Sequence, residues 1–590
     1  RPLVDCVPIV PAAMEERQIV QWDKDSCADA GFLKIDLLGL GMLSAVERCV
    51  ELIAQERGER IDLSRIPYDD PDTYRCIQEA DTTGVFQIES RAQMQSLRRT
   101  RPETLQDITI QVAIVRPGPI QGGAVNPYIE RRQRLRADPD FEVPYLHESL
   151  REPLAETLGT IIFQDQVLEV AVAFAGFSLG RAEGLRRAMS KKRSEAAIEQ
   201  HHRGFVEGAV ALHGVSEELA EEVFQMVKGF SGFGFPKAHG AAFGLLAYQS
   251  TWLRVHYGPE FLCALLNEQP MGFYPPDSLI HEAQRRGLVV RAPDVNRSAV
   301  ECSMDADGSV RIGLGYVRGV KAEQLEALVA ARSAGGAFAS PEDLASRAGA
   351  GAPALELLAW SGACDGLVGE REDRRHVLWR IGVATPGRGV KGGVQLALDL
   401  GSSEAPGLKP LSAWEAMLAD YASTGLTATT HPLELLRRAR KLPSKAVRST
   451  ELERLEHGVR VSVGGMVVAR QRPGTAGGVV FVLLEDEVGV INLVVPAKVY
   501  ERHRLAVRTE PLLAVEGKLE RYAAGGGVIN VLVDKLAPLS APDRIMAQIK
   551  DFSPLDELVR TSLAEGEGEG SEDFRAVAPA VMSFGAGRRR

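Results

Sequence analysis

The hydrophobic residues of this chain follow two different periods, and the change between them divides the fold. Over most of residues 43–297, apolar side chains recur at i, i+3 and i+4, for example in DQVLEVAVAFA at 165–175 and EELAEEVFQMVK at 217–228. This spacing places them on one face of an α-helix. Residues 458–539 instead alternate apolar and polar positions between glycine turns, which predicts four or five strands of an OB-type β-barrel. The sequence therefore predicts a multidomain α+β protein.

A glycine-rich bend in the helical region carries the most informative pair of polar residues. GFGFPKAHGAAFGLLAYQSTWLR, residues 232–254, places Lys237 and His239 two positions apart, directly before an apolar helix that we expect to begin near Ala241. Glycines let a backbone approach a ligand closely, and a Lys/His pair supplies donors for an anion such as phosphate. Alternatively, His239 caps the helix. The pattern predicts a phosphate site at this bend.

The distribution of charge and cysteine limits the class of protein. A formal net charge of −10 over 590 residues argues against a histone-like binder of nucleic acid. Residues 181–193 nevertheless contain six basic residues and one acidic residue, which is typical of a local polyanion-binding face.

Seven cysteines without a CxxC pair predict a reduced, cytoplasmic protein with neither zinc site nor disulfides. No apolar run reaches transmembrane length, so we expect no membrane partner.

Several single residues are candidates for binding or catalysis. Asp36 lies in the apolar stretch LKIDLLGL, where a buried carboxylate must bind metal, pair with Lys34 on the same strand face, or cap the next turn.

In TTGVFQIES, residues 82–90, we expect a turn, a short strand and a helix start. Gln87 is there a candidate DNA contact, although core packing also explains most of this stretch. Arg116 in VRPGP is held between turn-forming dipeptides, which suits a phosphate contact.

The segment LRRAMSKK predicts a basic helix face. Leu185 and Met189 mark its buried side, and the remaining faces carry the four basic residues Arg186, Arg187, Lys191 and Lys192. A run of charge is usually a solvated helix face. Here no acidic residue follows Glu183 within the run, which favours binding of a polyanion.

Six motifs occur in a fixed order along the chain: LKIDLLGL, TTGVFQIES, VRPGP, IIFQDQV followed by AGFS, LRRAMSKK and FGFPKAHGAAFGLLAYQ. In this order they resemble the bacterial DNA polymerase III alpha-subunit family, the C-family of DNA polymerases. The stretches QWDKDSC, NEQPMGFYPPDSL and RQRPGTAGG look most like the error-prone branch, which performs damage-tolerant translesion synthesis. The resemblance covers residues 1 to about 539.

The resemblance implies a domain order. The expected parts are a C-terminal palm segment with the last palm strand at 1–40, mostly helical fingers at 41–300, a helix-hairpin-helix domain at 301–370, a connector at 371–456, an OB-fold domain at 457–540 and a disordered tail at 541–590.

The resemblance also implies roles for single residues. Asp36 matches a palm aspartate that binds catalytic Mg²⁺, and Lys34 matches a lysine near the incoming triphosphate. Residues matching fingers positions that face the nucleotide and the DNA are Arg116, Lys191, Lys192, Lys237 and His239. Phosphoryl transfer needs such cations on the triphosphate and carboxylates on two metal ions.

Two metal-binding aspartates of the family lie in a PDxD-type motif that this sequence lacks. We therefore expect the chain to be a C-terminal half that is inactive alone, with deoxynucleoside triphosphates and primer-template DNA as substrates of the whole enzyme. QLALDL at 395–400 is placed like a sliding-clamp peptide but has no aromatic anchor, which favours recruitment to the clamp through an accessory mutagenesis protein. Two alternatives stay open: a replicative alpha subunit, and a non-catalytic DNA-binding factor.

Overall fold

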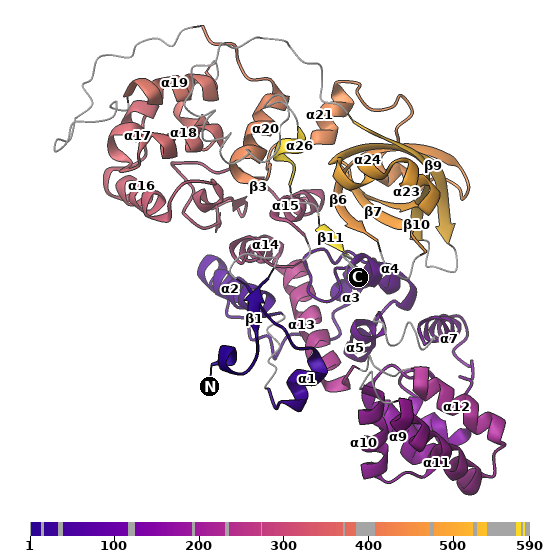
Figure 1. Ribbon diagram of the computed structural model, residues 1–590. Coiled ribbons are helices and arrows are strands. Elements are labelled where there is room, and N and C mark those ends of the chain that lie inside the picture. The colour runs from indigo at the N-terminus through magenta and orange to yellow at the C-terminus, as the bar shows by residue number, and fades with distance from the viewer. Residues whose placement is uncertain are drawn as a thin grey trace. The chain divides into compact units, whose positions relative to one another are not determined.

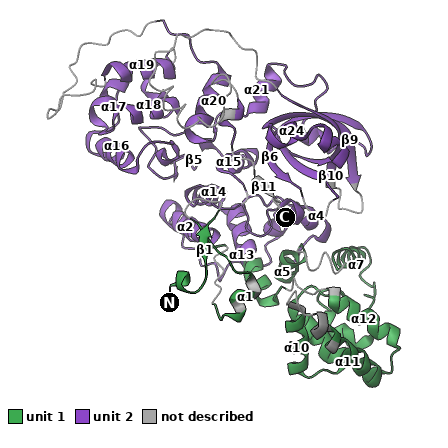
Figure 2. Cartoon of the chain, viewed as in Figure 1, with its two compact units in different colours: residues 1–40, 104–245 green, residues 41–103, 246–590 purple. Residues whose placement is uncertain are grey.

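The computed structural model describes most of the chain. The described residues are 2–12, 17–32, 39–115, 124–190, 195–229, 235–272, 274–369, 372–384, 407–472, 477–522, 528–539, 574–579 and 582–584. Predictions that fall outside them concern Lys34, Asp36 and the last palm strand, Arg116, Lys191, Lys192, and the stretch 395–400. The chain forms two compact units: unit 1 comprises residues 1–40 and 104–245, and unit 2 comprises residues 41–103 and 246–590 (Figure 2).

The described residues of unit 1 form helices and one short antiparallel pair, β1 (Ile9–Pro11) and β2 (Gln18–Val20). Its helices are α1 (Lys24–Asp29), α5 (Leu105–Ile114), α7 (Val125–Ala137), α8 (Arg151–Leu154), α9 (Gln164–Ala175), α10 (Leu179–Ser190), α11 (Glu195–His213), α12 (Glu217–Gly229) and the start of α13 (Lys237–His256) (Figure 1). The helices predicted at 165–175 and 217–228 are confirmed as α9 and α12.

The core of unit 1 lies among α9, α10, α11 and α12. Phe174, Phe205 and Phe224 are buried there, with ring centroids 5.9 and 5.4 Å apart in successive pairs. Leu185 on α10 is also fully buried, as its position in the basic helix predicts. This core fixes the faces on which the charged residues of α9 and α10 stand.

The helical part of unit 2 contains the TTGVFQIES motif. Its helices are α2 (Leu40–Arg57), α3 (Pro71–Gln78), α4 (Arg91–Thr100), the rest of α13, α14 (Gly258–Asn267) and α15 (Pro276–Arg285). The short strand predicted within 82–90 is wrong, because these residues form turns that side-chain hydrogen bonds close. Thr82 Oγ1 donates to the Ile88 carbonyl at 2.7 Å, and the Gly84 N–H donates to the buried Glu89 carboxylate at 3.1 Å.

The expected helical hairpins follow a small sheet. The sheet has the order β3 (Val290–Arg291), β5 (Val310–Arg311), β4 (Ser303–Met304). The helices are α16 (Ala322–Gly335), α17 (Pro341–Arg347), α18 (Ala352–Trp360) and α19 (Arg374–Ala384), which share one apolar core. The connector contributes α20 (Ala413–Thr424), α21 (Pro432–Arg438) and α22 (Ser449–Leu452).

The alternating segment folds into the predicted barrel. Its five strands are β6 (Arg460–Gln471), β7 (Val480–Glu485), β8 (Val490–Val495), β9 (Leu512–Tyr522) and β10 (Val528–Pro538), with α23 (Ala497–Arg502) and α24 (Arg504–Thr509) between β8 and β9. β6 pairs with both β7 and β9, which closes the sheet in the order β6-β7-β8-β10-β9. Ile491, Leu493 and Val495 point into the barrel core, so Val490 and Asn492 face outward.

The tail predicted to be disordered is ordered at two places. α26 (Phe574–Val577) buries Phe574 against Trp414 and Tyr421 of α20, with ring centroids 6.2 and 5.2 Å apart. β11 (Met582–Phe584) adds to β6 as a parallel edge strand. The acidic, glycine-rich composition of the tail gave no indication of these two short elements. Within the described part of the chain, no helix has the length and apolar character needed to cross a membrane.

Candidate nucleotide and nucleic-acid site

Lys237 is the first residue of α13, so the helix begins four residues earlier than predicted. Pro236 has no N–H to leave unsatisfied, and its carbonyl accepts the first helical hydrogen bond, from Gly240 at 3.1 Å. The N–H of Lys237 donates to Asp165 Oδ2 at 2.8 Å. A carboxylate from α9 therefore caps α13, and the alternative in which His239 caps the helix is wrong.

The Lys237 side chain is paired with an acid in this structure. Its Nζ lies 2.6 Å from Glu156 Oε2, and the lysine side chain remains 47% exposed. Burial, and after it the charge of Glu156, raises the pKa of Glu169, and Asp165 adds to the same effect. Lys237 thus stands among three carboxylates. A partly exposed ion pair of this kind is weak.

Two arginines of the basic helix α10 are paired with an acidic residue of the same helix, although the sequence predicts a basic face open to a polyanion. Glu183 accepts from Arg186 at 2.7 Å and from Arg187 at 2.9 Å, so one carboxylate holds two guanidinium groups. These hydrogen bonds lower the pKa of Glu183 to about 2. Glu183, followed by the charge of Asp165, raises the pKa of Arg186. The structure therefore brings Arg186 and Lys237 within electrostatic reach of the same residue, Asp165.

His239 and the neighbouring glycines serve packing. The His239 ring lies edge-on between Phe235 and Phe243, with centroids 5.0 and 4.3 Å away. A Cβ on Gly244 would lie 3.1 Å from Thr109 Oγ1 and 3.2 Å from the Thr109 backbone N, and one on Gly240 would lie 3.3 Å from the same residue. These two glycines, expected to admit a ligand, instead let α13 pack closely against α5.

Gln87 belongs to unit 2 and lies in the turns before α4. Its backbone is in the left-handed region, with φ of 70°, and its side chain is half-buried. Ser90 caps α4 by accepting the Gln93 N–H at 3.3 Å, which confirms the predicted helix start. Val85 and Ile88 are fully buried, as expected. Gln87 stays a predicted DNA contact, like Arg186, Arg187, Lys237 and His239 in unit 1.

Sequence reasoning missed Glu156 and Asp165, the two acids that bind Lys237. Asp165 could have been noticed, because it stands in the first turn of the predicted helix 165–175, where a carboxylate is favourable. Glu156 gave no comparable signal. Its role depends on a contact between positions 81 residues apart in the sequence.

One group of possible metal ligands occurs among the described residues: His281, His431 and Glu485, all buried. Two imidazoles and one carboxylate do not suit Mg²⁺, which prefers oxygen ligands. In addition, His431 Nδ1 accepts the Leu433 N–H at 3.1 Å, so Nε2 carries the ring proton and offers no lone pair. Although burial opposes its ionisation, the hydrogen bond from His281 and the nearby imidazole of His431 hold the pKa of Glu485 well below its usual range. The group is a buried ionic network and does not fit a magnesium centre.

Four family models match successive parts of the chain. They are the bacterial DNA polymerase III alpha NTPase domain at 1–39, the finger domain of the same subunit at 42–213, a helix-hairpin-helix motif at 287–375 and an OB-fold nucleic acid binding domain at 461–539. Their order is the order of the elements described above.

Curated relatives match nearly the whole chain. An error-prone DNA polymerase of Pseudomonas fluorescens is 43% identical over 94% of this chain and 53% of its own length. Proteins of the same name from Mycobacterium bovis and from an Anaeromyxobacter species are 41% and 43% identical, each over 94% of this chain and 49% of the relative. The chain thus spans about half the length of the curated relatives it matches. A solved asparaginyl-tRNA synthetase from Pyrococcus horikoshii matches 19% of the chain at 24% identity, with a TM-score of 0.14 that is too low to interpret.

Proposed function

Because this chain belongs to the bacterial DNA polymerase III alpha-subunit family and is most similar to its error-prone branch, we propose that it acts in DNA-directed synthesis across damaged template. The observation that carries this proposal is the identity to error-prone DNA polymerases over 94% of the chain. The helical finger region, the helix-hairpin-helix motif and the OB-fold domain support nucleic acid as the partner.

In the proposed enzyme the described residues bind and orient phosphate groups. The Lys237 side chain exchanges its ion pair with Glu156 for an ion pair with the triphosphate of an incoming deoxynucleotide or with a DNA phosphate. Arg186 adds a second cation near Asp165. The proposed set of contacts is completed by Arg187, Lys34, Arg116, Lys191, Lys192, His239 and Gln87. Mg²⁺ is the proposed cofactor, with Asp36 as one ligand, and it supplies the charge stabilisation that phosphoryl transfer requires.

Two further parts of the proposal concern the chain alone and its recruitment. One aspartate does not hold two metal ions, so the 590-residue chain is expected to bind primer-template DNA without extending it. Recruitment to a sliding clamp is proposed to depend on an accessory protein, because residues 395–400 lack an aromatic anchor.

Primer extension by the native gene product tests the function. We expect extension past a template lesion by the native protein, and loss of extension with retained DNA binding in Asp36→Ala. The matched control is Asp29→Ala, which removes an exposed carboxylate from the same segment. Undiminished extension by Asp36→Ala would contradict the metal role, and nucleotide incorporation by the 590-residue chain alone would contradict its expected inactivity.

A further inference from the structure

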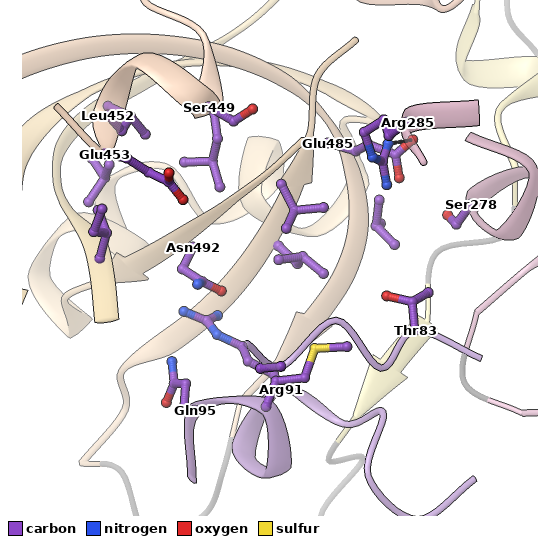
Figure 3. A pocket seen from close by; sticks show the side chains of 18 of the residues that line it. Thr83, Arg91, Gln95, Ser278, Arg285, Ser449, Leu452, Glu453, Glu485 and Asn492 are labelled. Carbon is purple, nitrogen blue, oxygen red and sulfur yellow. Dashed lines mark ion pairs between the residues drawn. The ribbon is translucent and has the colours of Figure 1, made fainter. Parts of the chain in front are cut away.

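A pocket of about 160 Å³ lies within unit 2, between α4 and the OB barrel (Figure 3). Polar residues line it from both sides. They include Arg91, Gln95 and Arg98 of α4, Asn492 of β8, and Ser449 of α22. Asn492 stands on the outward face of its strand, so the pocket uses the outside of the barrel and not its core. None of these residues belongs to the site described above.

Arg91 is half-buried, and its guanidinium group lacks a full set of partners. Its atoms Nε and Nη1 are buried and make no hydrogen bond to any described residue. Nη2 has a long contact of 3.4 Å to Asn530 Oδ1, and the guanidinium carbon lies 5.2 Å from the centre of the Phe481 ring. In Figure 3 the side chain extends from α4 toward Asn492. A buried charge in this state is unfavourable unless something else compensates it.

The described residues around the pocket do not provide that compensation. Arg91 is the first residue of α4, where the helix dipole disfavours a cation. Of the carboxylates lining the pocket, Glu485 is engaged by His281 at 2.7 Å and by Arg285 at 3.4 Å, and Glu453 is drawn apart from the guanidinium in Figure 3. Burial without a carboxylate lowers the pKa of Arg91 to about 10. The site therefore has two buried guanidinium donors and the charge to hold an anion.

We propose that this pocket binds a phosphate group through Arg91, with Gln95 and Asn492 as neutral partners. The guanidinium fork matches the oxygens of a phosphate, and the outer surface of an OB barrel is a common location for nucleic-acid contacts. The phosphate belongs to single-stranded DNA or to a free nucleotide. The choice of these two sources rests on the proposed function, whereas the anion site itself rests on the geometry alone.

Binding measurements on the 590-residue chain test the site with three probes: a fluorescent oligo(dT), dTTP and inorganic phosphate. Arg91→Met is expected to weaken binding of at least one probe about tenfold, the loss of one charge-assisted contact. If oligo(dT) is the source, the slope of log affinity against log salt falls by about 1. Arg60→Met, which removes an exposed arginine elsewhere in unit 2, is the matched control.

A second variant keeps the test decisive if Arg91→Met does not fold. Asn492→Asp places a carboxylate in the pocket, where it competes with the anion for Arg91, and is expected to weaken the same probe. Phosphate should also raise the unfolding temperature of the parent chain more than that of either variant.

A loss confined to oligo(dT) assigns the site to a polynucleotide, and a loss confined to dTTP and phosphate assigns it to a free nucleotide. Unchanged affinity for all three probes in both variants overturns the site. Arg91-dependent phosphate binding by the 590-residue chain, together with failure of the native gene product to extend primers, would count against the proposed function and leave this inference standing.

Discussion

The backbone N–H of Lys237 donates to the carboxylate of Asp165 over 2.8 Å, which joins the first turn of α13 to the first turn of α9. A second hydrogen bond, from the Gln164 N–H to the Phe235 carbonyl at 3.0 Å, connects the start of α9 to the residues just before α13. The Asp165 carboxylate thus faces the positive ends of two helix dipoles. The backbone at Lys237 is thereby held in a fixed position, and the proposed exchange of Glu156 for a ligand involves only its side chain.

Removing this cap is expected to loosen the start of α13. Asp165→Ala should lower the free energy of local opening at residues 237–240 by about 1 kcal/mol, the usual effect of losing a cap. Hydrogen exchange of peptides from this helix measures it. Asp165→Asn keeps an acceptor and should lose less; equal exchange in all three proteins would show that the cap is unimportant.

Neutralising Glu183 is expected to strengthen DNA binding, because Arg186 and Arg187 lose their shared partner. Glu183→Gln should raise affinity severalfold at low salt and steepen the slope of log affinity against log salt by about 1. Fluorescence anisotropy with a primer-template measures both. Glu207→Gln, an equal change of charge at an exposed site on α11, is the control. Equal gains in both variants would indicate a general effect of net charge.

The same carboxylate predicts a pH dependence. The pKa of Glu183 is lowered from 4.5 to about 2 in the folded protein, chiefly by its hydrogen bonds to the two arginines. Because the folded value is the lower one, the ion pairs stabilise α10 fully above pH 4.5, and that stabilisation is lost as the pH falls toward 2. An NMR titration of the Glu183 carboxyl carbon should give a midpoint near 2. A midpoint at 4.5 would mean that the pairs do not persist in solution.

Arg254 closes a buried ionic group in unit 2, with Asp81 at 2.7 Å and with Glu282. Its pKa is raised above the ordinary arginine value, because these acids outweigh its burial. Arg254→Met should destabilise the protein by about 3–5 kcal/mol, since Glu282 would be left buried and unpaired. Thermal unfolding measures this, and Arg254→Met/Glu282→Gln should recover part of the loss. Arg75→Met, which breaks an exposed pair, should change stability by less than about 1 kcal/mol.

Alanine substitution is expected to change stability in opposite directions at two helical glycines, one at the contact of α13 with α5 and one in open space. Gly244→Ala should destabilise the protein, because strain of about 1–3 kcal/mol against the Thr109 backbone exceeds a gain in helix propensity of about 1 kcal/mol. Gly382→Ala in α19 meets no atom within 4 Å and should be neutral or stabilising. Unfolding temperatures distinguish the two. Equal stability of both variants would show that the close helix contact is absent in solution.

The sequence by itself determined the types of element and much of their order. The helices α9 and α12 and the OB barrel followed from periodicity, because the face that a side chain occupies depends on its immediate neighbours in the chain. The helix-hairpin-helix region was expected from the resemblance to the family. The motifs likewise identified the family. The turns at 82–90 were mispredicted, because side-chain hydrogen bonds within the segment hold turns where a strand was expected. The ordered residues around Phe574 were missed, because a contact with Tyr421, remote in sequence, is not visible in the local composition.

Only the tertiary structure decided which charges are available to a ligand. Lys237 meets Asp165 and Glu156 across 72 and 81 residues, and Arg91 meets Asn530 across 439 residues. The same packing turned Gly240 and Gly244 toward Thr109. The net charge of a local segment says little about pairing, because the strength of an ion pair depends on distance and burial, and both are fixed by contacts between residues remote in sequence.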